Sequence, residues 1–179
     1  MEPTPGAKRT RKMSSCGPRA QALRWLARRP LTVVETSRRL ASEGFDGAEV
    51  ERTVEALKSE GLLDDESLAF DFVVLRSARM QRGKRRLLLE LERRGVDPGV
   101  AERAYQAAVD SGDLDPQTLL REAVAMRLKR ERVLTDAGLR RVYNALLRAG
   151  FPAAELYAEL KRQRDAFGPA EHENHDEGP

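Results

Sequence analysis

The strongest constraint on this chain is a glycine that recurs at the end of a leucine-containing stretch. Each copy reads leucine, three residues, glycine and then an apolar residue, and the three glycines are Gly44, Gly95 and Gly150. Glycine is favoured just past the C-terminus of a helix because it adopts positive φ without steric cost. A helix-start residue follows each copy: Asp46, Asp97 before Pro98, and Pro152. The copies recur about every 50 residues, a period that indicates tandem helical units.

Apolar side chains at helical spacing divide each unit into three helices. The predicted helices cover 19–28, 32–43 and 47–60, then 65–80, 84–94 and 98–110, then 116–132, 136–149 and 153–166. The predicted fold class is all-α, an elongated array of three tandem three-helix repeats with boundaries at 18–61, 62–112 and 113–167. The remaining residues form a basic N-terminal tail, 1–17, and an acidic C-terminal tail, 168–179, whose compositions predict disorder.

The helix over 65–80 differs from the others because its apolar residues fall on two sides. Leu68, Phe72 and Leu75 lie along one side, and Phe70 and Val74 lie along the other. A helix that is apolar on two sides is usually packed between neighbours. We therefore expect this helix at the centre of the array, in contact with adjacent units.

The number of cysteines and the hydropathy of the sequence indicate the cellular compartment in which the protein is expected. Cys16 is the single cysteine, so no internal disulfide can form. No stretch approaches the ~18 apolar residues of a membrane span, and no apolar signal segment follows the basic residues near the N-terminus. We expect a soluble cytoplasmic protein, with translation starting at Met1 or Met13.

No catalytic, cofactor or metal motif occurs in the sequence. The spacings of phosphate-binding loops, serine hydrolases and zinc proteases are all missing. Asp64 and Asp65 stand at a predicted helix start, where aspartate more often caps free N–H groups than binds a metal. His172 and His175 lie in the acidic tail, where two ligands without fixed geometry bind a metal only weakly. The sequence predicts a protein that is not an enzyme and holds neither cofactor nor metal.

A central segment resembles the signature of the RecX regulators. Residues 61–65 read Gly-Leu-Leu-Asp-Asp, a helix with two phenylalanines and a basic turn follow, and Gly83 opens the stretch that ends at Gly95. The residues around Leu23, Leu26 and Leu40 are similar to the family's opening helices, and 146–151 resembles its terminal repeat. The resemblance covers about residues 22–166. Its structural motif comprises Gly44, Gly61, Asp64, Asp65, Gly95 and Gly150.

The resemblance implies a regulatory function. RecX proteins bind the filament that the recombinase RecA forms on DNA, suppress its ATP hydrolysis and strand exchange, and bind DNA themselves. For this chain it implies an inhibitor of RecA that modulates homologous recombination, DNA repair and the SOS response. The expected partners are the RecA filament and, weakly, single- or double-stranded DNA. We expect a monomer with no membrane partner.

Basic residues recur at equivalent places in the second and third units. Counted back from the repeat glycine, both units carry arginine at the same two positions: Arg86 and Arg93, then Arg141 and Arg148. These positions lie opposite the apolar stripes of their helices, so we expect the side chains to face outward. The preceding turn adds Arg76, Arg79, Arg82, Lys84 and Arg85. All of these residues are candidate contacts to the filament or to DNA phosphates, with solvated surface as the alternative.

Two other functions fit the same pattern. One is a helical DNA-binding module that acts independently of RecA, because three-helix units with a basic helix are common in such proteins. The other is a generic helical adaptor with an unrelated protein partner. The aromatic residues that could stack on bases are expected to pack between helices instead, and these are Trp25, Tyr105, Tyr143 and Tyr157.

Overall fold

The structure, a computed structural model, describes residues 16–131 and 135–166, so the predicted tails lie outside it except for Cys16 and Gly17. Its helices are α1 Pro18–Leu26, α2 Val33–Glu43, α3 Gly47–Ser59, α4 Asp65–Met80, α5 Lys84–Arg93, α6 Pro98–Asp110, α7 Pro116–Leu128, α8 Asp136–Arg148 and α9 Ala153–Ala166. The bounds agree closely with the predicted ones, and the largest difference is α7, which ends at Leu128 instead of at 132. None of the described helices has the length and apolar character that crossing a membrane requires.

Side chains at the predicted positions cap the helix starts. Thr32 and Asp46 open α2 and α3 in capping boxes. In each box the cap side chain accepts from the backbone N–H of a glutamate three residues later, and the carboxylate of that glutamate accepts from the backbone N–H of the cap residue. Asp64 accepts hydrogen bonds from the backbone N–H groups of Glu66 and Ser67 at 2.9 and 3.1 Å. The predicted role of Asp64 as the cap of α4 is confirmed.

The repeat glycines stop the second helix of each unit in left-handed backbone. φ is +100° at Gly44, +89° at Gly95 and +93° at Gly150. The apolar residue after each glycine folds back, and its N–H donates to the carbonyl of the repeat leucine: Phe45 to Leu40, Val96 to Leu91 and Phe151 to Leu146. This is the predicted helix stop. Gly61 and Gly112 also have positive φ, +70° and +81°, after α3 and α6.

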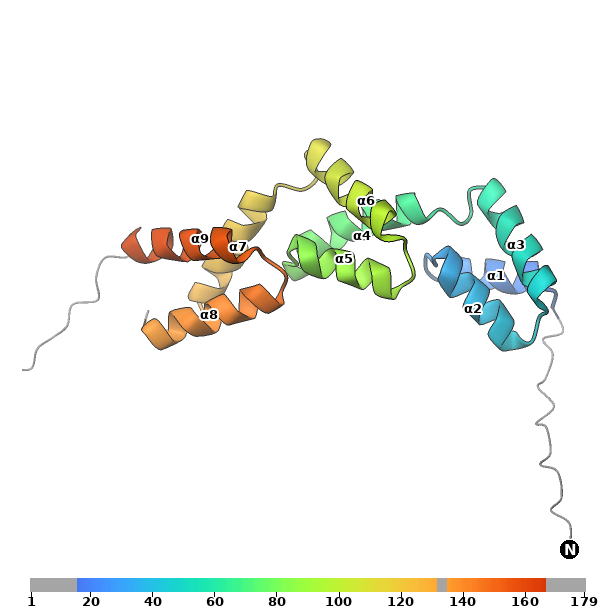
Figure 1. The fold of residues 1–179 in the computed structure, drawn as a ribbon, viewed down its shortest axis with the longest axis horizontal. Helices are drawn as coiled ribbons and strands as arrows, with labels where there is room; N and C mark the ends of the chain where they lie inside the picture. Colours follow the sequence, from blue (N-terminus) through green and yellow to red (C-terminus); the bar gives the residue numbers. More distant parts are fainter. Residues whose placement is uncertain (1–15, 132–134, 167–179) are drawn as a thin grey trace, which may run out of the picture.

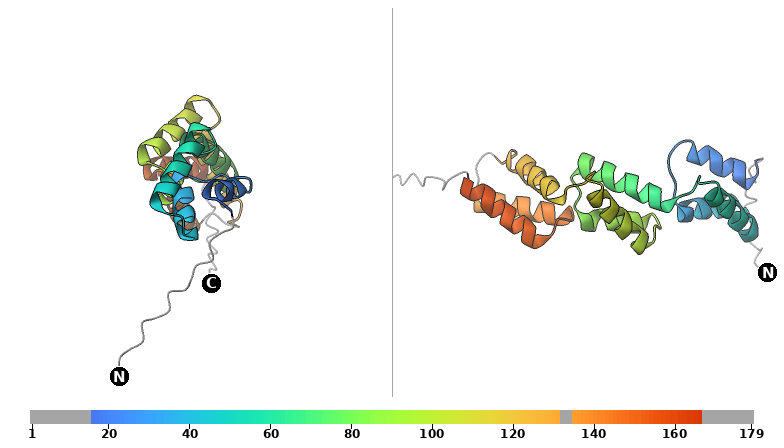
Figure 2. Two further views of the ribbon diagram at one scale, coloured as in Figure 1. Left: turned by 90° about the vertical axis from the view of Figure 1, so that its right-hand side faces the viewer. Right: turned by 90° about the horizontal axis from the view of Figure 1, so that it is seen from above.

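The helices form three units of three that follow one another along the long axis (Figure 1). α1–α3 pack on one another, as do α4–α6 and α7–α9. The view from above in Figure 2 has the same three groups in a row. The predicted all-α, elongated array of three-helix repeats is confirmed, while the residue boundaries 18–61, 62–112 and 113–167 stay a prediction.

The second helices of the three units lie head to tail. The C-terminus of α8 meets the N-terminus of α5, and the C-terminus of α5 meets the N-terminus of α2 (Figure 1). The Gly83 N–H donates to the Ala149 carbonyl at 2.9 Å, and Thr32 Oγ1 donates to the Arg94 carbonyl at 2.8 Å. Each contact brings the negative end of one helix dipole to the positive end of the next, which is a favourable alignment.

Two repeat glycines also form the contact with the preceding unit. A Cβ added at Gly95 would lie 2.5 Å from the Cβ of Val34, at the start of α2. A Cβ added at Gly150 would lie 2.4 Å from the backbone nitrogen of Arg86, at the start of α5. Gly44, with no preceding unit, has nothing within 4 Å of such an atom. Only the second and third units therefore need glycine for close approach as well as for positive φ.

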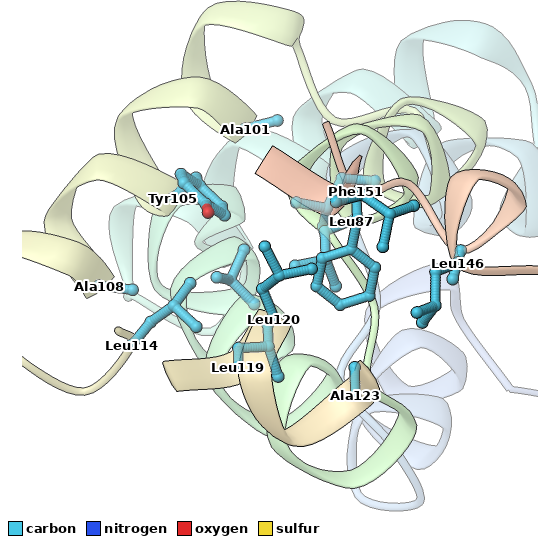
Figure 3. Packing of buried hydrophobic residues seen from close by; sticks show 14 of the residues in the cluster. Leu87, Ala101, Tyr105, Ala108, Leu114, Leu119, Leu120, Ala123, Leu146 and Phe151 are labelled. Atoms are coloured by element: carbon cyan, nitrogen blue, oxygen red, sulfur yellow. The ribbon is translucent and has the colours of Figure 1, made fainter. Parts of the chain in front are cut away.

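Units two and three share one hydrophobic core, whereas the first unit has its own. The smaller cluster contains only residues between Ala22 and Leu63. The larger runs from Leu68 to Leu160 and joins α4–α9. Phe151, which follows α8, lies in this larger cluster with Leu87 of α5 and Leu120 of α7 (Figure 3). Apolar packing therefore joins units two and three.

α4 lies in the central unit, as expected, and Asp65 at its start contacts Val33 of the first unit, but the prediction that both of its apolar sides are packed is wrong for Leu75. Leu75 is 52% exposed. The buried residues lie on one face instead, and they are Leu68, Ala69, Val73 and Ser77. α4 packs mainly against α6 of its own unit. The helix was misassigned because half-buried aromatic residues such as Phe72 cover the edges of a single apolar face.

Candidate functional site

Two of the predicted contact residues are held within their own unit. Lys84 pairs with Glu102, and its Nζ lies 4.9 Å from the centre of the Tyr105 ring, so it fastens α5 to α6. Arg86 Nε donates to Glu90 Oε1 at 2.7 Å. The Arg86 side chain is 34% exposed, so it faces outward only in part. Its backbone is covered by the C-terminus of α8, a contact between units that the periodicity of α5 cannot reveal.

Most of the other predicted contact residues are more accessible, but Arg82 is not, because its side chain is only 30% exposed. The guanidinium of Arg76 lies 5.3 Å from the centre of the Phe72 ring, a cation–π contact that leaves it half-buried. Arg141 is exposed and donates to Glu131 at 2.6 Å. The remaining exposed residues of the predicted set are Arg79, Arg85, Arg93 and Arg148.

Part of the predicted set converges on a groove between α7 and α8. This groove, which we call the arginine groove, has a volume of about 410 Å³. Its charged lining residues are Arg127, Arg130, Arg141 and Arg148, with Glu131 as the single acid among its lining residues. The list of candidate contacts lacked Arg127 and Arg130, although the basic run at 127–130 was the signal that could have placed them there.

Arg82 completes the cluster from the neighbouring unit. The pKa of the Arg127 guanidinium is lowered, first by burial and then by the positive charges of Arg130, Arg82 and Arg148. The Nε atoms of Arg82 and Arg127 are buried and have no hydrogen-bond partner within the described part of the chain. Among the residues that the structure describes, Arg82 forms an ion pair only with Glu90, with 3.9 Å between its Nε and Glu90 Oε1. The groove of the third unit thus gathers like charges, and Arg82 of the second unit adds another positive charge to them.

The backbone at this junction explains why the arginines meet. Gln81 ends α4 in left-handed backbone, with φ +47°, and turns the chain toward α7 and α8. A Cβ at Gly83 would lie 2.4 Å from the carbonyl carbon of Gly150, so only glycine allows these two backbone segments to approach this closely. Because Arg82 and Arg148 lie one and two residues from these glycines, the approach brings their side chains together.

The junction of units one and two is polar and internally paired. Arg94 donates to Glu35 through Nε and Nη2, both at 3.0 Å, and Asp65 Oδ1 accepts from the Val33 N–H at 3.0 Å. Burial by itself raises the pKa of Glu35, but hydrogen bonds from Arg94 and the Thr32 N–H outweigh it and lower the pKa overall. Burial raises the pKa of Asp65. Asp65 therefore stabilises the junction between units one and two, whereas Asp64 caps α4.

A second groove lies between α8 and α9, with a volume of about 570 Å³. We call it the tyrosine groove, and its apolar lining residues are Leu139, Tyr143, Tyr157 and Leu160. The expectation that aromatic residues pack between helices is met by Tyr105, which is 7% exposed, but is wrong for Tyr157, which is 67% exposed. The exposed position of Tyr157 on α9 depends on how the third unit packs.

The described residues contain no group of three or more His, Cys, Asp or Glu side chains that could hold a metal ion. His172 and His175 lie outside the described residues.

Comparisons with known proteins point to one family. The family description "RecX, first three-helix domain" matches residues 19–57. Regulatory protein RecX of Mycobacterium sp. (strain JLS) is 33% identical over 158 residues, which cover 81% of this chain and 85% of that protein. Regulatory protein RecX of Mycobacterium ulcerans is 33% identical over 82% of this chain and 88% of that protein. The crystal structure of RecX from Lactobacillus salivarius has a TM-score of 0.67 at 20% identity and covers 82% of this chain and 94% of that one.

These relatives match more than four-fifths of the chain and carry a regulatory name, not that of an enzyme. The solved structure shares its fold of helical repeats. The chain therefore belongs to the RecX family of regulatory proteins.

Proposed function

We propose that this protein binds the filament of the recombinase RecA on DNA and inhibits its ATPase and recombinase activities. In this role it modulates homologous recombination, DNA repair and the SOS response in the cytoplasm, and it acts as a monomer. Membership of the RecX family supports a regulatory role. The observation that carries the proposal is the arginine groove of the third unit, where the fold gathers like charges beside Arg82 of the second unit.

A bound phosphate would relieve the repulsion in this groove. The positive charges of the groove repel one another, and a single acid among the lining residues offsets little of this repulsion. The arginines concerned are Arg127, Arg130 and Arg148. Guanidinium groups donate to phosphate oxygens through charge-assisted hydrogen bonds, and the counterions released from DNA add to the affinity. The guanidinium groups of the arginines that line the groove supply such donors. The groove therefore suits the DNA phosphates inside a filament.

The elongated shape suits a helical filament better than a small ligand. Three units in a row present a long surface, as repeat proteins do. Weak contacts by separate units to successive filament subunits would add through effective concentration. A chain held along the filament in this way would block the subunit movements that ATP turnover requires.

The test measures the DNA-dependent ATPase of RecA against increasing amounts of this protein. The variant combines Arg93→Glu with Arg148→Glu, since both side chains are exposed. Replacing Arg148 also relieves repulsion with Arg127, so the fold should not weaken. The control combines Arg52→Glu with Arg103→Glu, which makes the same change in net charge on exposed positions of third helices. Arg103 loses only an exposed pair with Glu66, worth at most about 1 kcal/mol.

We expect the control to inhibit RecA like the parent and the variant to need a much higher concentration. The salt dependence of filament binding should also become weaker for the variant, because fewer counterions are released. A parent protein that binds DNA but leaves the ATPase unchanged would favour the DNA-binding module that acts independently of RecA. A parent protein that binds neither DNA nor the RecA filament would favour the generic adaptor.

A further inference from the structure

The tyrosine groove carries cations on both of its walls. On α9, Tyr157, Lys161 and Arg164 are spaced by four and three residues, so they share one helix face. On α8, Arg140 and Tyr143 are spaced by three residues and share the opposing face. Asp136 is the only acid among the lining residues. Each wall therefore presents one aromatic ring beside positive charge.

Tyr157 is the most exposed large apolar side chain of the described residues, at 67%. A tyrosine in such a position contributes little to folding, because burial of apolar area supplies most of the stabilisation from an aromatic side chain. An aromatic ring flanked by cations is the arrangement that proteins use to stack a base while they hold its phosphates. The ring is thus available for a partner that has both planar faces and negative charge.

The two grooves meet on α8. Asn144 lines both the tyrosine groove and the arginine groove, and its side chain is exposed. A strand that crosses α8 at Asn144 can place phosphates among Arg127, Arg130 and Arg148 and a base on the other side of the helix. An acidic peptide would satisfy the cations but would leave the tyrosine rings without planar partners.

We propose that the tyrosine groove takes an unpaired base of single-stranded nucleic acid, while the arginine groove takes the adjoining phosphates. This inference rests on the proposed contact with DNA and deepens it, because it names the single strand as the form that is recognised. A duplex cannot fill both grooves, since its bases are stacked on one another and their faces are covered.

The test uses the full chain without any recombinase. Binding is measured by fluorescence anisotropy with three labelled probes of equal length: a thymidine single strand, the same strand with its central bases replaced by abasic sites, and a duplex. Tyr157→Ala should weaken binding to the thymidine strand about tenfold, within the range of one lost stacking contact. Tyr157→Phe should bind like the parent because the ring remains.

The abasic strand isolates the stacking contact. The parent should bind it about tenfold more weakly than the thymidine strand, whereas Tyr157→Ala should bind the two strands equally. The control is Leu62→Ala, which removes another exposed apolar side chain far from α8 and should behave like the parent. Circular dichroism should confirm that all variants keep the parent's helix content.

The inference is overturned if Tyr157→Ala binds all three probes like the parent, because attraction would then come from phosphates alone or the groove would serve another partner. It is also overturned if the parent prefers the duplex. Since RecA is missing from the assay, these outcomes do not depend on the ATPase result. A parent that discriminates the abasic strand but fails to inhibit RecA would uphold the groove and refute the proposed regulation.

Discussion

The repeat glycines have two roles, ending a helix at positive φ and packing on the preceding unit. A comparison of Gly44 with Gly95 separates the energies of these two roles. Gly44 and Gly95 both have positive φ, but only Gly95 packs on the preceding unit. Gly44→Ala should cost about 1–2 kcal/mol, the strain of left-handed backbone for a residue with a Cβ. Gly95→Ala carries the same strain and also places its Cβ 2.5 Å from the Cβ of Val34, where something must shift. Such overpacking typically costs a further 1–3 kcal/mol.

The measurement is urea unfolding followed by circular dichroism, with the midpoint concentration compared across variants. Both substitutions restrict the unfolded chain in the same way, so their comparison removes that effect. The midpoint should fall clearly further for Gly95→Ala than for Gly44→Ala.

A double-mutant cycle with Val34→Gly identifies the contact. Val34→Gly removes the colliding atoms, so Gly95→Ala should cost about 1–3 kcal/mol less in that background than in the parent. Gly44 lies ten residues further along α2, roughly 15 Å from Val34, so its substitution should be additive with Val34→Gly. Equal midpoints for the two alanine variants, or additivity at Gly95, would refute the role of this glycine in joining the units.

Three further predictions concern a junction, a helix end and the shared core. Glu35→Gln should destabilise the protein at neutral pH, but the difference should vanish in acid, as the pH falls through the pKa of Glu35, which lies below the ordinary glutamate range. If the difference persists at low pH, the ion pair with Arg94 is not its cause. Gln81→Gly should raise stability by up to about 1 kcal/mol by relieving positive φ, and a lower urea midpoint would contradict this. Phe151→Ala should cost about 3–5 kcal/mol because Phe151 is 5% exposed in the core of units two and three. A loss below 1 kcal/mol in the same assay would mean that this core is not shared.

The helices, their ends and their grouping into repeats follow from patterns in the amino-acid sequence. Each of these depends on residues close together in the chain: a cap such as Asp64, a stop such as Gly95 and an apolar stripe repeated every three or four positions. The energies are local, so the pattern predicts them without knowledge of the neighbouring units. For the same reason the resemblance to one family was visible before the fold was known.

The contacts between units, by contrast, depend on how the folded units pack on one another. Arg86 lies on the polar side of α5 but is half-buried because α8 ends against its backbone. Arg82 and Arg127 are 45 residues apart and converge because the backbones of Gly83 and Gly150 touch. The pattern within one helix fixes which face is apolar, but the rotation and spacing between units depend on contacts between residues distant in sequence. The arginine groove forms where α7 and α8 pack within the third unit, and those contacts between units bring Arg82 of the second unit to its arginines.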